Sequence, residues 1–236
     1  LMDEEVKKRV ISTIESLGYR NLFLSQEKKT DSFFKPRILV SINDRSLITF
    51  NLKGTKATNI FSWLTLKYIG REGIKLRFQF DKTKYAFEYG DEALFNAITY
   101  ALQNLLTHTE LKAVKFDQFH IAPPNIYPPS SALNRIKECS SLLKVQLYEN
   151  SLEVIKNMLV YMQPNINITD IPGYAVLLSI SLDSLPFWSY IKTLTISGMG
   201  TIDPYKVTQP YASYFNSLRV LEMNCPRSND FGSFMT

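Results

Sequence analysis

The chain has little of the chemistry that enzymes and metal sites use. Its only two histidines, His108 and His120, have no partner at the spacing of a metal site or a catalytic triad. There is no glycine-rich phosphate loop, because Gly198 and Gly200 alone do not make one. Scattered aspartates fall in turn sequences, where aspartate caps the backbone. We therefore expect a protein that is not an enzyme and that needs neither a metal nor another cofactor.

Further absences indicate the setting of the protein. Cys139 and Cys225 are the only cysteines, too few for a disulfide framework, and two packed thiols fit a reducing compartment. Apolar runs are only a few residues long, so the sequence predicts no transmembrane helix. The acidic residues Asp3, Glu4 and Glu5 are unlike a signal peptide, and the last residues form no recognisable closing element. We expect a piece of a longer cytoplasmic protein.

Positive charge is concentrated in the first half of the sequence. Residues 1–115 contain 19 lysines and arginines against 13 acidic residues, whereas residues 116–236 contain 8 against 9. A basic half suits an anionic surface such as phospholipid or nucleic acid, and the alternative is an ordinary solvated face. We do not expect nucleic acid as a partner, because the phenylalanines and tyrosines alternate as core residues and form no exposed stacking row.

The first half alternates like a sheet between two helices. Apolar residues at helical spacing predict one helix from Asp3 to Leu17 and another from Asp91 to Leu106. Between them, alternating segments such as Ile74 to Phe80 predict about seven short antiparallel strands, one of them over Ile60 to Ile69. The sequence therefore predicts an α+β domain: an antiparallel β-barrel with its C-terminal helix across one end.

Prolines separate this half from the rest. Pro123, Pro124, Pro128 and Pro129 mark a linker between the charged and the neutral half. The expected domains are residues 1–115, residues 116–131 as the linker, and residues 132–236.

Beyond the linker, the spacing L-x-x-L-x-L-x-x-N of leucine-rich repeats recurs. Units beginning at 142, 163, 191 and 218 predict the start of an α/β solenoid. The alternative is an irregular α/β domain. Parallel strands are predicted at 145–147, 166–168, 194–196 and 221–223. The expected repeat core consists of Leu142, Val145, Leu147, Asn150, Ile191, Leu194, Ile196, Leu218, Leu221 and Met223.

The pattern and order of these segments carry a resemblance. The stretches ILVSINDRSLITF (Ile38 to Phe50) and TNIFSWLTL (Thr58 to Leu66), with the closing helix, resemble the N-terminal domain of the CARMIL family. In that family a divergent pleckstrin-homology domain with an N-terminal helix leads into leucine-rich repeats. One departure is that the closing helix here lacks the tryptophan common in ordinary pleckstrin-homology domains. The resemblance implies a regulator of actin capping protein and actin assembly, located in the cytoplasm and peripherally at the plasma membrane or cell cortex.

Basic and aromatic residues gather around the first predicted hairpin. They resemble the pleckstrin-homology lipid signature, in which a lysine is followed by K/R-x-R across the first two strands. Several cations converging from a hairpin can pair with an inositol phosphate, and adjacent phenylalanines can dip into the headgroup region. Alternatively, the cations mark an ordinary strand start and the phenylalanines belong to the core. The candidate lipid-binding residues are Lys28, Lys29, Lys35, Arg37, Phe33 and Phe34.

Two functions of different kinds follow. The first is a membrane-targeting scaffold fragment that attracts anionic phospholipid weakly and contacts proteins through its repeats, with a homodimer as a means of doubling the basic patch. The second is a pure protein-interaction module, a leucine-rich-repeat adaptor that offers a concave surface and binds no lipid.

Overall fold

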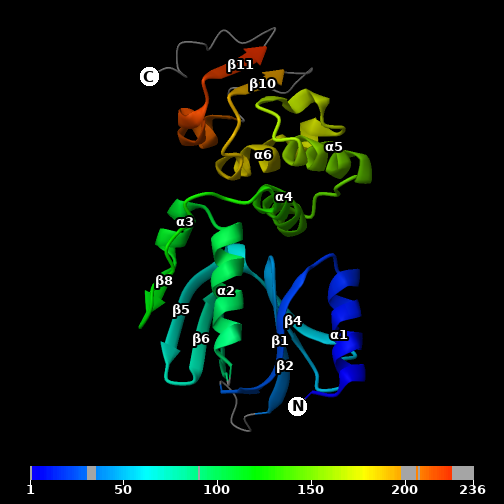
Figure 1. Ribbon diagram of the computed structural model, residues 1–236, viewed down its shortest axis with the longest axis vertical. Coiled ribbons are helices and arrows are strands. Elements are labelled where there is room, and N and C mark those ends of the chain that lie inside the picture. Colours follow the sequence, from blue (N-terminus) through cyan, green and yellow to red (C-terminus); the bar gives the residue numbers. More distant parts are fainter. Residues whose placement is uncertain (1, 31–35, 90, 198–205, 207, 225–236) are drawn as a thin grey trace. The chain divides into compact units, whose positions relative to one another are not determined.

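The computed structural model describes residues 2–30, 36–89, 91–197, 206 and 208–224 (Figure 1). Contacts divide the chain into two compact units, residues 1–125 and 126–236, and each has its own hydrophobic core. The division falls inside the proline-rich segment 116–131. Each unit is described by itself below.

The first unit is built on one eight-stranded sheet in the order β4-β3-β2-β1-β7-β6-β5-β8. Neighbouring strands are antiparallel, apart from the parallel pair of β5 and β8. The predicted large antiparallel sheet is confirmed. The predicted barrel is not closed, because β4 and β8 remain as the two edges among the described residues. The elements are α1 (Glu4–Ser16), β1 (Asn21–Lys29), β2 (Arg37–Asn43), β3 (Ser46–Phe50), β4 (Ala57–Ser62), η1 (Trp63–Thr65), β5 (Leu66–Glu72), β6 (Lys75–Phe80), β7 (Thr83–Glu88), α2 (Glu92–Leu105), α3 (His108–Ala113) and β8 (Lys115–Asp117).

Two halves of this sheet meet through a short ladder and an aromatic core. In the described residues, β1 pairs with β7 only at Lys28 opposite Glu88 and at the next pair along the ladder. Elsewhere the halves pack through side chains. The Phe61 ring of β4 stacks on the Phe80 ring of β6 with centroids 4.8 Å apart, and Trp63 lies 5.8 Å from Phe80. Stacked and tilted ring contacts therefore hold together strands that share no backbone hydrogen bonds.

Helix α1 covers the outer face of the first half of the sheet. Asp3 caps it by accepting a hydrogen bond from the Glu5 amide, and Val10 and Ile14 are buried against Leu39 and neighbouring residues of β2 and β3. The turn before β4 approaches this helix closely. Gly54 has φ +65°, and a Cβ there would lie 2.7 Å from the Val10 Cγ2, so only glycine fits.

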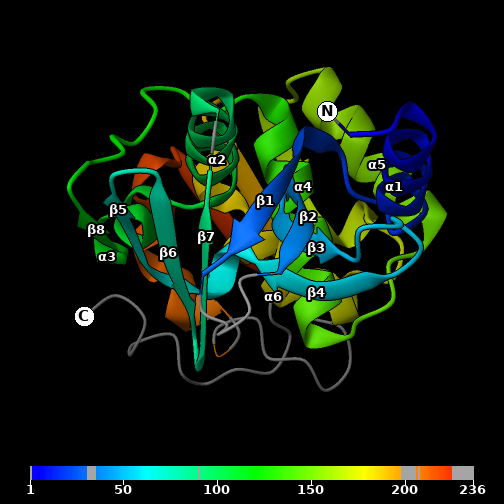
Figure 2. The ribbon, with the colours of Figure 1, turned by 90° about the horizontal axis from the view of Figure 1, so that it is seen from below.

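Helix α2 fills the space between the two halves. Its N-cap Asp91 accepts from the Ala93 amide, and the helix contacts β1, β2 and η1. Figure 2 shows it between the β5–β7 part and the β1–β2 part of the sheet. The predicted helical stripe is confirmed, since Leu94, Ile98 and Leu102 are all fully buried.

The structure corrects several sequence expectations in this unit. The single strand expected over Ile60 to Ile69 is two strands, because Ser62 accepts from the Leu64 amide and turns the chain through η1. That turn places Trp63 in the core, where its Nε1 donates to the Asn43 carbonyl at 3.0 Å. Strand β1 (Asn21–Lys29) is longer than its short apolar stretch Leu22 to Leu24 suggests. Part of the expected linker is also structured, since β8 pairs with β5 and α4 begins at Pro129.

The second unit combines helices with a three-stranded parallel sheet. Its core contains Ile136, Ile155, Leu177, Phe187 and Leu194, and α4 contacts both α5 and α6. The strand order is β11-β10-β9, with Leu194 opposite both Ile166 and Leu221. The elements are α4 (Pro129–Leu143), α5 (Glu149–Val160), β9 (Asn165–Asn167), η2 (Ile168–Asp170), α6 (Tyr174–Asp183), η3 (Leu185–Phe187), β10 (Thr193–Ser197), η4 (Gln209–Ser217) and β11 (Val220–Asn224).

The repeat prediction holds for three strands and fails for the first. Parallel strands lie close to the positions predicted at 166–168, 194–196 and 221–223, whereas 145–147 is not a strand. Leu142 lies in the last turn of α4 and is 45% exposed, and Asn150 belongs to α5. Leu142 belongs to a helix and not to a repeat strand, because Ala132 and Ile136 form a buried stripe at helical spacing. The repeat spacing did not take this stripe into account. Three parallel strands do not amount to a solenoid.

Of the other expected core positions, Ile191, Leu194 and Ile196 are buried. The remaining residues are partly buried against the same core: Val145, Leu147, Leu218, Leu221 and Met223.

Replacing Trp63 by phenylalanine should destabilise the first unit by about 2 kcal/mol, because the buried Asn43 carbonyl loses its Nε1 donor. The chain has only two tryptophans, so the fluorescence of the variant reports on Trp188 in the second unit. In urea, circular dichroism should show an earlier transition while the Trp188 transition stays in place. Equal movement of both signals would contradict two separately stable units.

Candidate functional site

The structure brings together three of the predicted lipid-binding residues. Lys28 and Arg37 lie opposite each other where β1 and β2 meet their connecting loop, and both are exposed. Lys29 is half-buried, with its amide donating to the Pro36 carbonyl and its Nζ 5.2 Å from the centroid of the Tyr85 ring. The other three candidates, Lys35, Phe33 and Phe34, lie outside the described residues.

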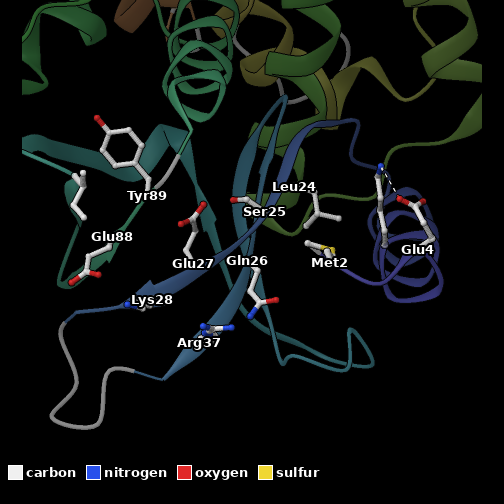
Figure 3. A pocket seen from close by; sticks show the side chains of 12 residues that line it. Met2, Glu4, Leu24, Ser25, Gln26, Glu27, Lys28, Arg37, Glu88 and Tyr89 are labelled. Carbon is white, nitrogen blue, oxygen red and sulfur yellow. Dashed lines mark ion pairs between the residues drawn. The ribbon is translucent and has the colours of Figure 1, made fainter.

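A cavity of about 620 Å³ opens beside this hairpin end (Figure 3). It lies where β1 leaves its short ladder with β7 and the beginning of α1 comes close. Because β1 contributes consecutive residues, side chains from both of its faces reach the cavity. This volume is within the range of small-molecule sites. Its lining consists of Met2, Glu4, Lys7, Leu24, Ser25, Gln26, Glu27, Lys28, Arg37, Ile74, Glu88 and Tyr89.

Glu27 is the unusual member of this lining. It is only 7% exposed, and no described residue forms an ion pair with its carboxylate. Burial raises the pKa of Glu27 above its ordinary value of 4.5, the Ser25 hydroxyl opposes this shift, and Asp91 adds to it. The Ser25 Oγ is itself buried without a hydrogen bond of standard geometry to a described residue. Two adjacent polar groups therefore border the cavity without full partners.

Charges of both signs surround the cavity. The bases Lys7, Lys28 and Arg37 face an equal number of acids, among which Glu4 forms an exposed ion pair with Lys7 at 3.7 Å. Figure 3 shows the Glu27 carboxylate pointing toward the side of Ser25 and Tyr89, away from Lys28 and Arg37. Glu27 thus lies at one side of the cavity, and Lys28 and Arg37 lie at the other, with Glu88 opposite Lys28 in the ladder.

Sequence reasoning missed Glu27, although a signal for it was present. Phe23, Ser25 and Glu27 alternate along one face of β1, and Phe23 packs against the main core of the first unit. Had the strand been extended to Lys29, this alternation would have placed Glu27 on a buried face.

A second polar cluster lies in the second unit. The buried Arg135 of α4 pairs through Nε with the Asp183 carboxylate at the end of α6, and the Cys139 Sγ donates to the same carboxylate at 3.1 Å. With Tyr211 they border a cavity of about 240 Å³. Burial, followed by the charge of Asp183, raises the pKa of Tyr211. The Asp183 carboxylate therefore accepts from both a guanidinium and a thiol.

The described residues contain neither a candidate metal cluster nor a helix that could span a membrane. Within the described ranges, no three histidine, cysteine, aspartate or glutamate side chains are close enough to hold a metal ion. None of the helices in those ranges is long and apolar enough to cross a bilayer.

Replacing Glu27 by glutamine should stabilise the protein at neutral pH. The folded-state pKa of Glu27 is raised, so its ionised form costs stability above that pKa, and the cost disappears as the pH falls below about 4. Urea unfolding at neutral and acidic pH should therefore show an advantage of the variant that shrinks on acidification. Glu15→Gln, at an exposed position of α1, is the matched control and should change nothing. A destabilised Glu27→Gln protein would instead identify the carboxylate as a structural hydrogen-bonding group.

Replacing Asp183 by asparagine should destabilise the second unit by about 3 kcal/mol, because it breaks the buried ion pair between Asp183 and Arg135. The Trp188 fluorescence transition in urea measures this effect. Glu153→Gln removes one negative charge from an exposed position of α5 and should leave the transition unchanged. Equal stability of the Asp183 variant and the parent would mean that the ion pair contributes nothing.

Comparison with known proteins adds no assignment to this geometry. No protein-family model matches the chain, and no curated protein matches it in sequence. The functional proposals below therefore depend on the residues and on the resemblance drawn from their pattern.

Proposed function

We propose that the chain is a non-enzymatic membrane-targeting and scaffold segment of a protein that resembles the CARMIL family. In this proposal, the first unit corresponds to the divergent pleckstrin-homology domain of that family, and the second unit corresponds to its first leucine-rich repeats. An antiparallel sheet followed directly by α2, and the parallel strands β9, β10 and β11, support this proposal. The observation that carries it is the exposed pair Lys28 and Arg37 at the end of the first hairpin.

The expected membrane attraction is weak. Each cation near an anionic leaflet contributes about 1 kcal/mol, so four cations at the hairpin, with Lys29 and Lys35 included, contribute about 4 kcal/mol. This corresponds to an affinity of about millimolar. A second contribution is therefore required, either insertion of Phe33 and Phe34 or a homodimer that doubles the patch.

The wider role follows from the resemblance alone. A segment of this kind would place a regulator of actin capping protein, and of actin assembly, at the cell cortex. The second unit would supply the surface for protein partners.

A pure protein-interaction module is the second candidate, and one observation favours it. The second unit exposes several large apolar side chains at the ends of α4 and α5 and on α6, and exposed apolar surface of this kind can bind a protein partner. More than half of each of the following side chains is exposed: Leu143, Val160, Tyr161, Met162 and Val176. In this alternative, the basic hairpin is a solvated surface and lipid plays no part.

Sedimentation with liposomes that contain anionic lipid tests the membrane proposal. Replacing Lys28, Lys29, Lys35 and Arg37 by glutamate should abolish cosedimentation, and raising the salt concentration should weaken binding of the parent through screening. Lys8, Lys53, Lys56 and Lys112 lie at other exposed positions of the first unit. Glutamate at those four positions changes the net charge equally and should retain most of the binding. If both quadruple variants bind equally, or binding ignores salt, the interaction-module function is the better account.

A further inference from the structure

The cavity beside β1 contains a mismatch that a ligand of defined chemistry would resolve. Glu27 is more than nine-tenths buried and points into the cavity, yet no described residue supplies a cation to it. A buried carboxylate without a counter-charge is costly, and an ammonium group at hydrogen-bond distance would offset that cost. The Ser25 hydroxyl oxygen beside it offers a second acceptor for the same group.

The opposite side of the cavity suits an anion. Lys28 and Arg37 are cross-strand neighbours, exposed, and without a side-chain partner among the described residues. An arginine and a lysine at neighbouring positions can bind phosphate oxygens through charge-assisted hydrogen bonds. Glu4 and Lys7 compensate each other across the beginning of α1. Two acids, Glu27 and Glu88, and two bases remain, and Glu88 lies opposite Lys28 in the β1–β7 ladder. The hairpin end therefore keeps an excess of one positive charge, while Glu27 faces away from it.

The path between the two sides is partly apolar. Met2, Leu24 and Ile74 contribute carbon surface to the lining. The edge of β1 also contributes backbone groups. The Thr30 amide donates to the Ala86 carbonyl, so by strand alternation Gln26 directs its amide and carbonyl toward the same edge. A short alkyl chain could therefore lie along the carbon surface, with the Gln26 amide and carbonyl left to water or to the polar ends of the ligand.

From these features we propose that the cavity between α1, β1 and the end of β7 binds a zwitterion that carries a primary ammonium and a phosphate joined by a short alkyl chain, as in phosphoethanolamine. The ammonium contacts Glu27 and Ser25, and the phosphate contacts Lys28 and Arg37. This site goes beyond the proposed attraction to anionic membranes. It does not rest on that proposal, because it requires the contact between the ammonium and Glu27, which attraction to an anionic membrane does not use.

The geometry favours a primary over a quaternary ammonium. A primary ammonium has three N–H donors for the carboxylate and the hydroxyl, whereas a trimethylammonium has none. Quaternary groups are recognised instead by open aromatic faces, and the Tyr89 ring already has the Arg71 guanidinium 5.5 Å from its centroid. Phosphocholine is therefore the discriminating comparison compound.

Isothermal titration of residues 1–236 with O-phosphoethanolamine and with O-phosphocholine tests the site. The parent should bind the first compound at least about tenfold more tightly than the second, the difference expected for a hydrogen bond to a charged group. Glu27→Gln should lose about tenfold in affinity for O-phosphoethanolamine, and the exposed control Glu15→Gln should lose nothing. Arg37→Ala removes an exposed side chain, so it keeps the test valid if the Glu27 variant misfolds, and it should also weaken binding. Equal binding of the two compounds, or parent affinity in both site variants, would overturn the proposal.

Vesicles distinguish the two sources of this chemistry. Phosphatidylcholine vesicles with and without phosphatidylethanolamine have no net charge, so attraction to anionic lipid plays no part in their binding. Glu27-dependent binding to the phosphatidylethanolamine vesicles would identify a lipid headgroup as the ligand. Binding of soluble O-phosphoethanolamine alone would identify a free metabolite. Absence of both would refute the site while leaving the proposed membrane targeting untouched.

Discussion

The two-residue ladder between β1 and β7 is the constraint on which the first unit depends. Lys28 and Lys29 pair with Glu88 and Phe87 and join two antiparallel halves into one sheet. A longer ladder would hold the halves flat against each other and would leave no room for α2. Because the ladder is short, the halves diverge from it, and their facing surfaces need a shared core. The aromatic cluster around Phe80 and the apolar face of α2 supply that core.

The same short ladder produces the candidate site. A strand that leaves its neighbour opens an edge, and α1 borders the opening through Met2, Glu4 and Lys7. Glu27 is the residue directly before the ladder. Its neighbours in the sheet bury it, yet its position at the opening keeps water or a ligand within reach. The pairing of β1 with β7, which joins the two halves of the sheet, thus also explains why the Glu27 carboxylate is desolvated.

Local patterns in the sequence predicted the elements better than their connections. The α2 stripe and the alternation of β6 are visible because each is set by burial of one continuous face. The corner at Trp63 was missed because it depends on a single hydroxyl, that of Ser62. The prediction that Leu142 begins a repeat was wrong, because a single apolar residue fits both a repeat strand and the end of a helix. Lys28 and Arg37 were found from their charge, whereas Glu27 was not, because its burial depends on a strand pairing remote in sequence.

The proposed membrane attraction and the proposed ligand site would be coupled, because both use Lys28 and Arg37. A phosphate bound by Lys28 and Arg37 neutralises the two exposed charges that the hairpin offers to an anionic leaflet. Ligand binding would then weaken membrane attraction. By thermodynamic reciprocity, an anionic membrane would weaken ligand binding by the same factor. With about 1 kcal/mol for each cation, losing two of them removes about half of the attraction estimated for the hairpin. A lipid headgroup bound in the cavity would not weaken membrane attraction in this way, because its phosphate already belongs to the membrane. The source of the ligand therefore decides whether the cavity opposes membrane association or contributes to it.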